Sequence, residues 1–141
     1  MNELTIEVSK IISASPEATF DAWLDPEALA RFILPKPGMP GPEVSNDPRT
    51  GGGFEIIMDV GDKKIPHHGE YVKIERPVRL EFSWNSPFSI EGSMVSILFE
   101  KIEEEKTKVT LTHTKFPNQE SCDNHRVGWG NILDALEIVL G

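Results

Sequence analysis

The sequence predicts an α+β fold in which a curved, seven-stranded antiparallel β-sheet wraps around a long C-terminal α-helix, with two short helices after the first strand. Three observations predict it. Residues 118–141 place apolar side chains at helical spacing, most of the preceding chain alternates apolar and polar residues, and four junctions between the later strands are short enough for hairpins. Because the apolar face of such a helix needs a sheet to cover it, we expect the helix to fill the concave side of the sheet.

Composition indicates a single domain spanning residues 1–141, with 38% hydrophobic and 26% charged residues. With 23 acidic and 14 basic residues, the net charge of −9 argues against binding to nucleic acid or to an anionic membrane. Cys122 is the only cysteine, which excludes an internal disulfide. The N-terminus lacks a signal-peptide pattern and there is no run of 18 apolar residues, so we expect a cytoplasmic protein.

The first strand is predicted over residues 4–12, where apolar and polar side chains alternate. Ser15 then caps a helix whose first residue is Pro16, a position where the missing N–H of proline costs nothing. Asp25 and Pro26 repeat this signal. Because proline disfavours helix in the residue before it, the sequence favours two short helices over one long helix.

Residues 34–42 contain four prolines and two glycines, and we interpret them as a surface loop or lid. An interdomain linker is the alternative, but too little chain precedes this segment to fold alone. A short strand is then expected over 43–46, a turn over 47–52, a strand over 53–60, and a tight hairpin at 61–62.

The next strand, expected over 63–74, has an ambiguous pattern. Val72 and Ile74 favour one face as the buried face, whereas Ile65 and Tyr71 favour the other. The sequence therefore leaves the facing of this strand open.

Three further strands and the long helix complete the predicted order. The strands are expected at 79–84, 94–100 and 109–114, with a loop at 85–93 and a charged turn at 103–106. Asn118 is placed to cap the helix. Gly128 and Gly130 lie inside it, where they either let a strand approach closely or leave room for a ligand. The apolar stripe of the helix consists of Trp129, Ile132, Leu133, Leu136 and Val139 or Leu140.

Several short motifs occur in order along nearly the whole chain. They are the segments 12–17, 20–23, 68–71, 74–77 and 110–113, together with Gly51-Gly52-Gly53-Phe54, Leu80-Glu81-Phe82-Ser83-Trp84, and His125, Gly128 and Trp129. In these motifs the chain resembles the family named after the activator of heat-shock-protein ATPase. That family belongs to the START and birch-pollen-allergen superfamily, also called SRPBCC. The resemblance implies a helix-grip fold, usually with an apolar cavity between the sheet and the C-terminal helix.

A set of mostly apolar and aromatic side chains is placed by this pattern between sheet and helix, where it would line a ligand cavity. For each residue alone, the ordinary interpretation is plain hydrophobic core. The candidate cavity residues are Phe54, Met58, Tyr71, Phe82, Trp84, His113, Trp129 and Leu133.

His113 is the candidate polar group of this set. It could donate a hydrogen bond to a ligand carbonyl or carboxylate, or act as a general base; the ordinary interpretation is a core histidine bonded to a backbone carbonyl. Either Glu70 or Tyr71 faces inward. An inward Glu70 near His68 or His113 would form an acid–base pair and favour an enzyme, whereas an outward Glu70 would be a solvated partner for a basic residue on the next strand.

Neither a metal nor a cofactor is expected. His67 and His68 are adjacent on a strand and point to opposite faces, so they cannot chelate one ion together. Cys122 and His125 could share a helix face, but a structural zinc needs four ligands and there is no second cysteine, so we interpret both as exposed helix residues. The glycines at 51–53 lack the context of a phosphate loop and are typical of a hairpin turn.

We interpret the protein as a non-enzymatic module that binds a small hydrophobic or amphipathic molecule between sheet and C-terminal helix. Two alternatives stay open. The resemblance implies a co-chaperone-like activator of a heat-shock chaperone ATPase, with a role in stress response. The other alternative is an enzyme of the polyketide cyclase or aromatase type that uses His113 or Glu70 as acid or base. The expected partners are thus a small hydrophobic molecule or a chaperone, and the protein is expected to be a monomer or a homodimer.

Overall fold

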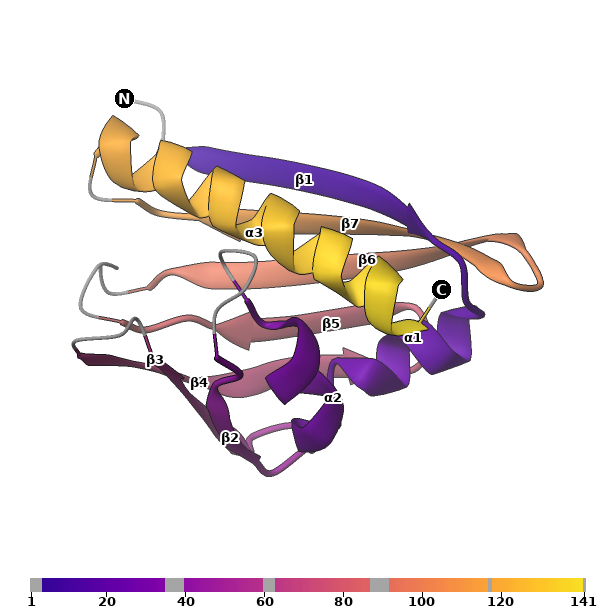
Figure 1. The fold of residues 1–141 in the computed structure, drawn as a ribbon, viewed down its shortest axis with the longest axis horizontal. Coiled ribbons are helices and arrows are strands. Elements are labelled where there is room, and N and C mark those ends of the chain that lie inside the picture. Colours follow the sequence, from indigo (N-terminus) through magenta and orange to yellow (C-terminus); the bar gives the residue numbers. More distant parts are fainter. Residues whose placement is uncertain (1–3, 35–39, 60–62, 87–91, 117, 141) are drawn as a thin grey trace.

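The structure is a computed structural model that describes residues 4–34, 40–59, 63–86, 92–116 and 118–140. Within these ranges, seven strands form one antiparallel sheet in the order β1-β7-β6-β5-β4-β3-β2 (Figure 1). The strands are β1 (Thr5–Ile12), β2 (Glu43–Asn46), β3 (Gly53–Asp59), β4 (Lys64–Glu75), β5 (Arg79–Ser83), β6 (Met94–Glu103) and β7 (Lys106–Thr114). The helices are α1 (Pro16–Ala22), α2 (Pro26–Phe32) and α3 (Gln119–Leu140).

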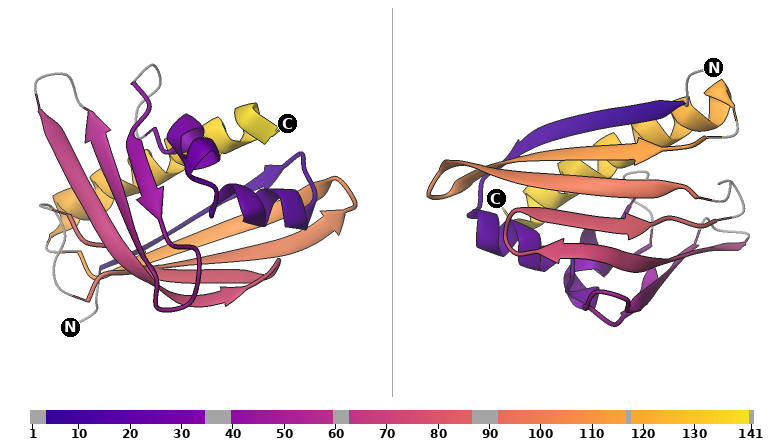
Figure 2. Two further views of the ribbon diagram at one scale, coloured as in Figure 1. Left: turned by 90° about the horizontal axis from the view of Figure 1, so that it is seen from below. Right: turned by 180° about the vertical axis from the view of Figure 1, so that it is seen from behind.

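All three helices lie on the concave side of the sheet, which curves around them (Figure 2). The long helix α3 packs along β1 and also contacts α2, while α1 contacts β6 and β7. The buried side chains of α3 are Cys122, Trp129, Ile132, Leu133 and Leu136. The predicted α+β fold, with a seven-stranded antiparallel sheet around a C-terminal helix, is confirmed.

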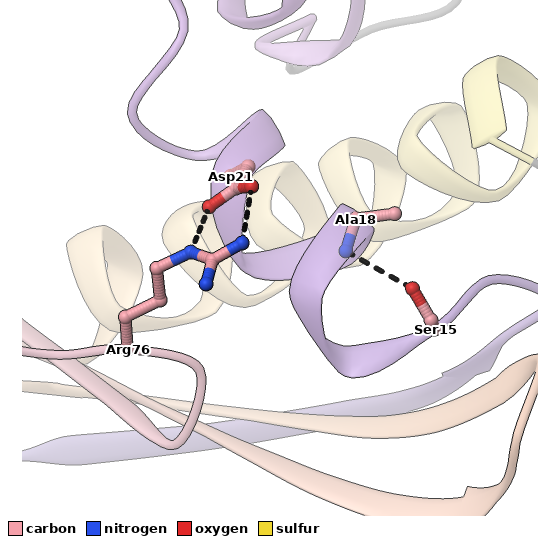
Figure 3. Close-up of polar contacts among 4 residues, drawn as sticks. All are labelled: Ser15, Ala18, Asp21 and Arg76. Carbon is pink, nitrogen blue, oxygen red and sulfur yellow. Dashed lines mark hydrogen bonds and ion pairs between the residues drawn. The ribbon is translucent and has the colours of Figure 1, made fainter.

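The helix starts are capped as the sequence predicts. The Ser15 hydroxyl accepts a hydrogen bond from the N–H of Ala18 at 3.1 Å (Figure 3), and the Asp25 carboxylate accepts one from Glu27 at 3.0 Å. At the start of α3, the Asn118 side chain accepts one from the N–H of Ser121 at 2.8 Å. These bonds satisfy backbone donors that have no partner inside the helix.

A bidentate ion pair ties α1 to the turn that follows β4. Arg76 donates two hydrogen bonds to the Asp21 carboxylate, at 2.8 and 2.9 Å (Figure 3). These bonds hold the pKa of Asp21 below its ordinary value. Both side chains are more than half exposed, so the pair positions α1 with only a small gain in stability.

The strand whose facing the sequence leaves open, β4, contains a bulge. Tyr71 pairs with Phe82 and Lys73 with Glu81, so that Val72 is the extra residue. Past the bulge, Ile74 pairs with Leu80, which is fully buried. A bulge reverses the alternation of faces, so Tyr71 and Ile74 both pack toward the core although their numbers differ in parity. Ile65 and Tyr71 therefore mark the inward face before the bulge and Ile74 the inward face after it, whereas Val72, which the pattern grouped with Ile74, is 50% exposed.

Some sequence predictions fall on residues outside the described ranges. The hairpin at 61–62 and the last residue, Gly141, lie wholly outside them, and the loops expected at 34–42 and 85–93 lie partly outside. The turn at 47–52 is described: Gly51 has a φ of 87°, a conformation that glycine adopts without strain.

Candidate functional site

A pocket lies between the sheet and the helices. Four of its lining residues come from the helical side of the molecule: Trp23, Leu29, Ile33 and Trp129. The other five come from β3, β4, β5 and the residue after β5: Phe54, Ile56, Tyr71, Phe82 and Trp84. All nine are apolar or aromatic, as is common for sites that hold small organic molecules.

The pocket is narrow and partly open. Its cavity volume is about 20 Å³, which gives room for on the order of one water molecule. A larger ligand must therefore lie partly at the opening to solvent or move the aromatic side chains.

The aromatic rings of the lining contact one another. The ring centre of Phe54 lies 5.4 Å from that of Tyr71 and 5.3 Å from that of Phe82. The ring centre of Trp129 lies 5.0 Å from that of Trp84 and 6.5 Å from that of Trp23. These separations fall in the range in which aromatic pairs attract each other beyond simple burial.

Gly69 makes room for the Phe54 ring. A Cβ added at Gly69 would lie 2.7 Å from the Phe54 ring and would overlap with the backbone oxygen of Ser83. No other residue type fits there without moving backbone or ring. The glycine thus permits the ring of Phe54 to cross the neighbouring strand and reach the pocket.

Two buried donors of the lining lack a hydrogen-bond partner in the part of the chain that the structure describes. Among the described residues, the buried side-chain nitrogens or oxygens without a hydrogen-bond partner are Nε1 of Trp23 and Nε1 of Trp84. Each tryptophan is only 3% exposed. A third polar group of the lining is satisfied: the Tyr71 hydroxyl oxygen accepts a bond from Nδ2 of Asn46 at 3.1 Å. Burial raises the pKa of Tyr71, so its hydroxyl stays protonated at neutral pH.

A buried hydrogen-bond chain runs behind the pocket through His113. The indole N–H of Trp129 donates to Nδ1 of His113 at 2.9 Å, so Nδ1 is the acceptor and the neutral ring carries its proton on Nε2. That Nε2–H donates to the Ser93 hydroxyl at 2.6 Å, and this hydroxyl donates to the Thr114 carbonyl at 3.2 Å. The chain fixes the tautomer of His113 and links α3 to β7.

Burial, with a smaller contribution from the nearby His125, lowers the pKa of His113 from 6.5 to about 3. Protonation of Nδ1 would also break the hydrogen bond from Trp129, because two N–H donors would then point at each other. His113 is fully buried and is absent from the pocket lining. At neutral pH it therefore acts as a neutral structural group, close to the ordinary interpretation of a core histidine.

Two more histidines are held neutral. His67 donates from Nδ1 to the Ile65 carbonyl at 3.1 Å, and burial lowers its pKa to about 4. His125 donates from Nδ1 to the Ser121 carbonyl at 2.8 Å, and burial lowers its pKa as well. Both rings pack against aromatic side chains, which accounts for their desolvation.

Five of the eight predicted cavity residues line the pocket: Phe54, Tyr71, Phe82, Trp84 and Trp129. The other three, Met58, His113 and Leu133, are buried in the core outside it. The lining also contains four residues that the prediction did not include: Trp23, Leu29, Ile33 and Ile56. Ile56 shares the inward face of its strand with Phe54, so strand alternation alone could have identified it. The other three required knowing where α1 and α2 lie on the sheet.

The structure decides one question that the sequence leaves open and corrects one interpretation. Glu70 is exposed and Tyr71 is buried, so Tyr71 is the inward residue and Glu70 forms no acid–base pair in the pocket. Cys122 is buried at 2% exposure and His125 is half-buried, so neither is an exposed helix residue. Both lie on the face of α3 that packs inward, because Cys122 is one turn before His125 and two turns before Trp129.

Within the described ranges, no group of three or more His, Cys, Asp or Glu side chains is arranged to hold a metal ion. A search of the same residues finds no helix with the length and apolar character needed to cross a membrane.

One protein family matches most of the chain. The family model described as Activator of Hsp90 ATPase homolog 1-like protein matches residues 13–141. A search of curated protein sequences finds no significant match.

Solved structures with the same fold are numerous, and three illustrate their range. A protein described as an HSP90 activator from Plasmodium falciparum is 25% identical, with a TM-score of 0.78 over 98% of this chain and 96% of that one. A protein from Chromobacterium violaceum is 22% identical, with a TM-score of 0.79 over 96% of both chains. A protein of unknown function from Staphylococcus aureus is 16% identical, with a TM-score of 0.83 over 99% of this chain and 94% of that one.

Proposed function

The chain belongs to the family of Activator of Hsp90 ATPase homolog 1-like proteins, and on that premise we propose that it binds a small apolar or amphipathic molecule in the pocket between its sheet and helices. The observation that carries the proposal is the lining of this pocket by nine apolar or aromatic side chains beside an opening to solvent. Binding in a pocket of this composition is favoured because the apolar surface of the ligand and of the lining is removed from water.

A dye-binding experiment tests the proposal. All three tryptophans of the chain line the pocket, so their emission reports on whatever enters it. The neutral dye N-phenyl-1-naphthylamine absorbs where tryptophan emits. We expect saturable binding of one dye per chain, with quenching of tryptophan emission and growth of dye emission.

A matched pair of variants separates the pocket from the surface. Ile56→Phe adds bulk to the lining and is expected to weaken dye binding at least tenfold, whereas Ile138→Phe adds the same bulk at a site that is 82% exposed and is expected to leave it unchanged. Circular dichroism checks that both variants are folded. Equal dye affinity of Ile56→Phe and the wild type, or the lack of saturable binding, would show that the pocket is not a binding site.

A second candidate function is activation of a heat-shock chaperone ATPase. It is supported by the family description and by the Plasmodium falciparum protein described as an HSP90 activator, which this chain matches over nearly its whole length. We expect co-purification with a Hsp90-type chaperone and a faster ATPase rate on addition of the protein. An unchanged rate at saturating protein would remove this candidate.

The enzyme alternative is not proposed, because the exposed position of Glu70 and the buried hydrogen bonds of His113 leave no acid–base pair in the pocket. The cytoplasmic location stays a prediction, which fractionation of the cells that make the protein would test.

A further inference from the structure

The tryptophans of the pocket carry information about the chemistry of its occupant. Nε1 of Trp23 and Nε1 of Trp84 are buried, and neither has a hydrogen-bond partner among the described residues. Buried polar groups without partners are rare in folded proteins, because each loses its bond to water without replacement. Both residues line the same pocket, and each ring lies near that of Trp129.

The remaining polar side-chain groups of the lining are donors as well. An indole N–H can only donate, and that of Trp129 is already used by His113. The Tyr71 oxygen accepts a bond from Asn46, and its own proton can only donate. A ligand that reaches these indole N–H groups meets donors, so it must bring an acceptor.

The charge of the lining restricts the acceptor. None of the nine lining side chains is Lys, Arg or His. A buried carboxylate would lose its hydration without gaining a cationic partner, which is much costlier than burying a neutral carbonyl. The net charge of −9 on the whole chain further disfavours an anion.

We propose, on the basis of the function proposed above, that the ligand is a neutral molecule with an apolar body and an accepting oxygen, such as a ketone, quinone or ester, which the indole N–H groups of Trp23 and Trp84 recognise. The pocket volume of about 20 Å³ admits little more than the carbonyl group itself. The apolar body of the ligand then lies toward the opening to solvent, or the aromatic side chains move to admit it.

Two probes of matched shape test the role of the oxygen. Acetophenone and α-methylstyrene have the same outline, with a C=O in the first replaced by C=CH₂ in the second. Acetophenone is expected to bind about tenfold more tightly, the effect of one additional buried hydrogen bond. Benzoate, which adds a negative charge, is expected to bind more weakly than acetophenone at pH 7.

The indole N–H signals in a ¹H–¹⁵N spectrum give a residue-specific readout. The chain has three tryptophans, so three signals are expected, and Trp→Phe variants assign them. Acetophenone is expected to move the indole protons of Trp23 and Trp84 downfield as hydrogen bonds form, and to move that of Trp129 least. The affinity comparison of acetophenone with α-methylstyrene uses the wild-type protein alone, so it does not depend on any variant being folded.

Variants assign the preference to the two donors. Trp23→Phe and Trp84→Phe each remove an N–H, and the affinity ratio of acetophenone to α-methylstyrene is expected to fall toward one. The control Phe82→Leu reduces contact area in the same pocket and removes no donor. It is expected to weaken both probes by similar factors and leave their ratio unchanged.

Several results would overturn the inference. Equal affinity for acetophenone and α-methylstyrene would do so while leaving pocket binding intact, as would tighter binding of benzoate. Binding of N-phenyl-1-naphthylamine without binding of acetophenone would also overturn it. So would indole proton signals of Trp23 and Trp84 that do not shift when acetophenone is saturating. Failure of every probe, including the naphthylamine, would instead refute the proposed function itself.

Discussion

Acidification is expected to destabilise the protein through two buried histidines. Burial lowers the pKa from 6.5 to about 3 for His113 and to about 4 for His67. In the unfolded chain both rings are hydrated and bind a proton below pH 6.5, whereas in the folded protein they stay neutral until the pH nears their lowered pKa values. The unfolded state therefore binds more protons, so stability is complete above pH 6.5 and is lost as the pH falls.

The magnitude follows from these pKa values. Moving from pH 8 to pH 5 is expected to lower the free energy of unfolding by about 2 kcal/mol for each histidine, or about 4 kcal/mol together. At pH 5 both lowered pKa values are still a unit or more below the solution pH, so the loss is set mainly by the unfolded chain. A domain of ordinary stability, about 5–15 kcal/mol, would lose a substantial part of it.

Urea unfolding followed by tryptophan emission at pH 8, 6.5, 5.5 and 5 measures this loss. In His113→Gln, the difference between pH 8 and pH 5 is expected to shrink by about 2 kcal/mol, whatever the substitution costs at pH 8. His68→Gln, at an exposed position, serves as the control and should keep the wild-type difference. A His113→Gln protein with the full wild-type difference, or an NMR titration of His113 near pH 6.5, would refute the reasoning.

Three further predictions concern two glycines and one residue of the buried hydrogen-bond chain. Gly130→Ala is expected to stabilise the protein by about 1 kcal/mol, because the added Cβ meets open space and alanine favours helix; a loss of stability in urea unfolding would contradict this. Gly69→Ala is expected to destabilise it by more than about 2 kcal/mol in the same assay, because its Cβ would meet the Ser83 oxygen, and a neutral result would show that the strands can separate locally. Trp129→Phe leaves the buried Nδ1 of His113 without its donor, at a cost of about 1–3 kcal/mol in addition to lost packing; a loss below 1 kcal/mol would indicate that the bond contributes little.

The fold could be predicted because its signals are local. Ser15, Asp25 and Asn118 cap helices through bonds to residues two or three positions ahead, and such bonds are specified by nearby sequence. The strands with clean alternation, such as β7, also show their buried face directly. The bulge at Val72 could not be located, because an extra residue is defined by the partner strand and not by its own sequence.

The pocket was only partly predictable for the same reason. Phe54, Phe82 and Trp129 lie on faces that periodicity identifies. Trp23 and Ile33 join them because α1 and α2 fold back over the sheet, and no local pattern sets that placement. The missing partners of two indole N–H groups depend on atoms from several elements at once, so they became visible only in three dimensions.

Pairing of the first strand with the last has a consequence for how the chain is made. Thr5 is opposite Thr114 and Ile12 is opposite Thr107, so β1 stays without its neighbour until β7 has been synthesised. Such distant pairings slow folding, because the chain loses the entropy of closing a long loop before the contacts between the two strands form. A nascent chain halted after β6 would thus carry β1 as an unpaired strand that can pair with other chains. The yield of folded protein should therefore depend on chaperones that bind nascent chains at the ribosome.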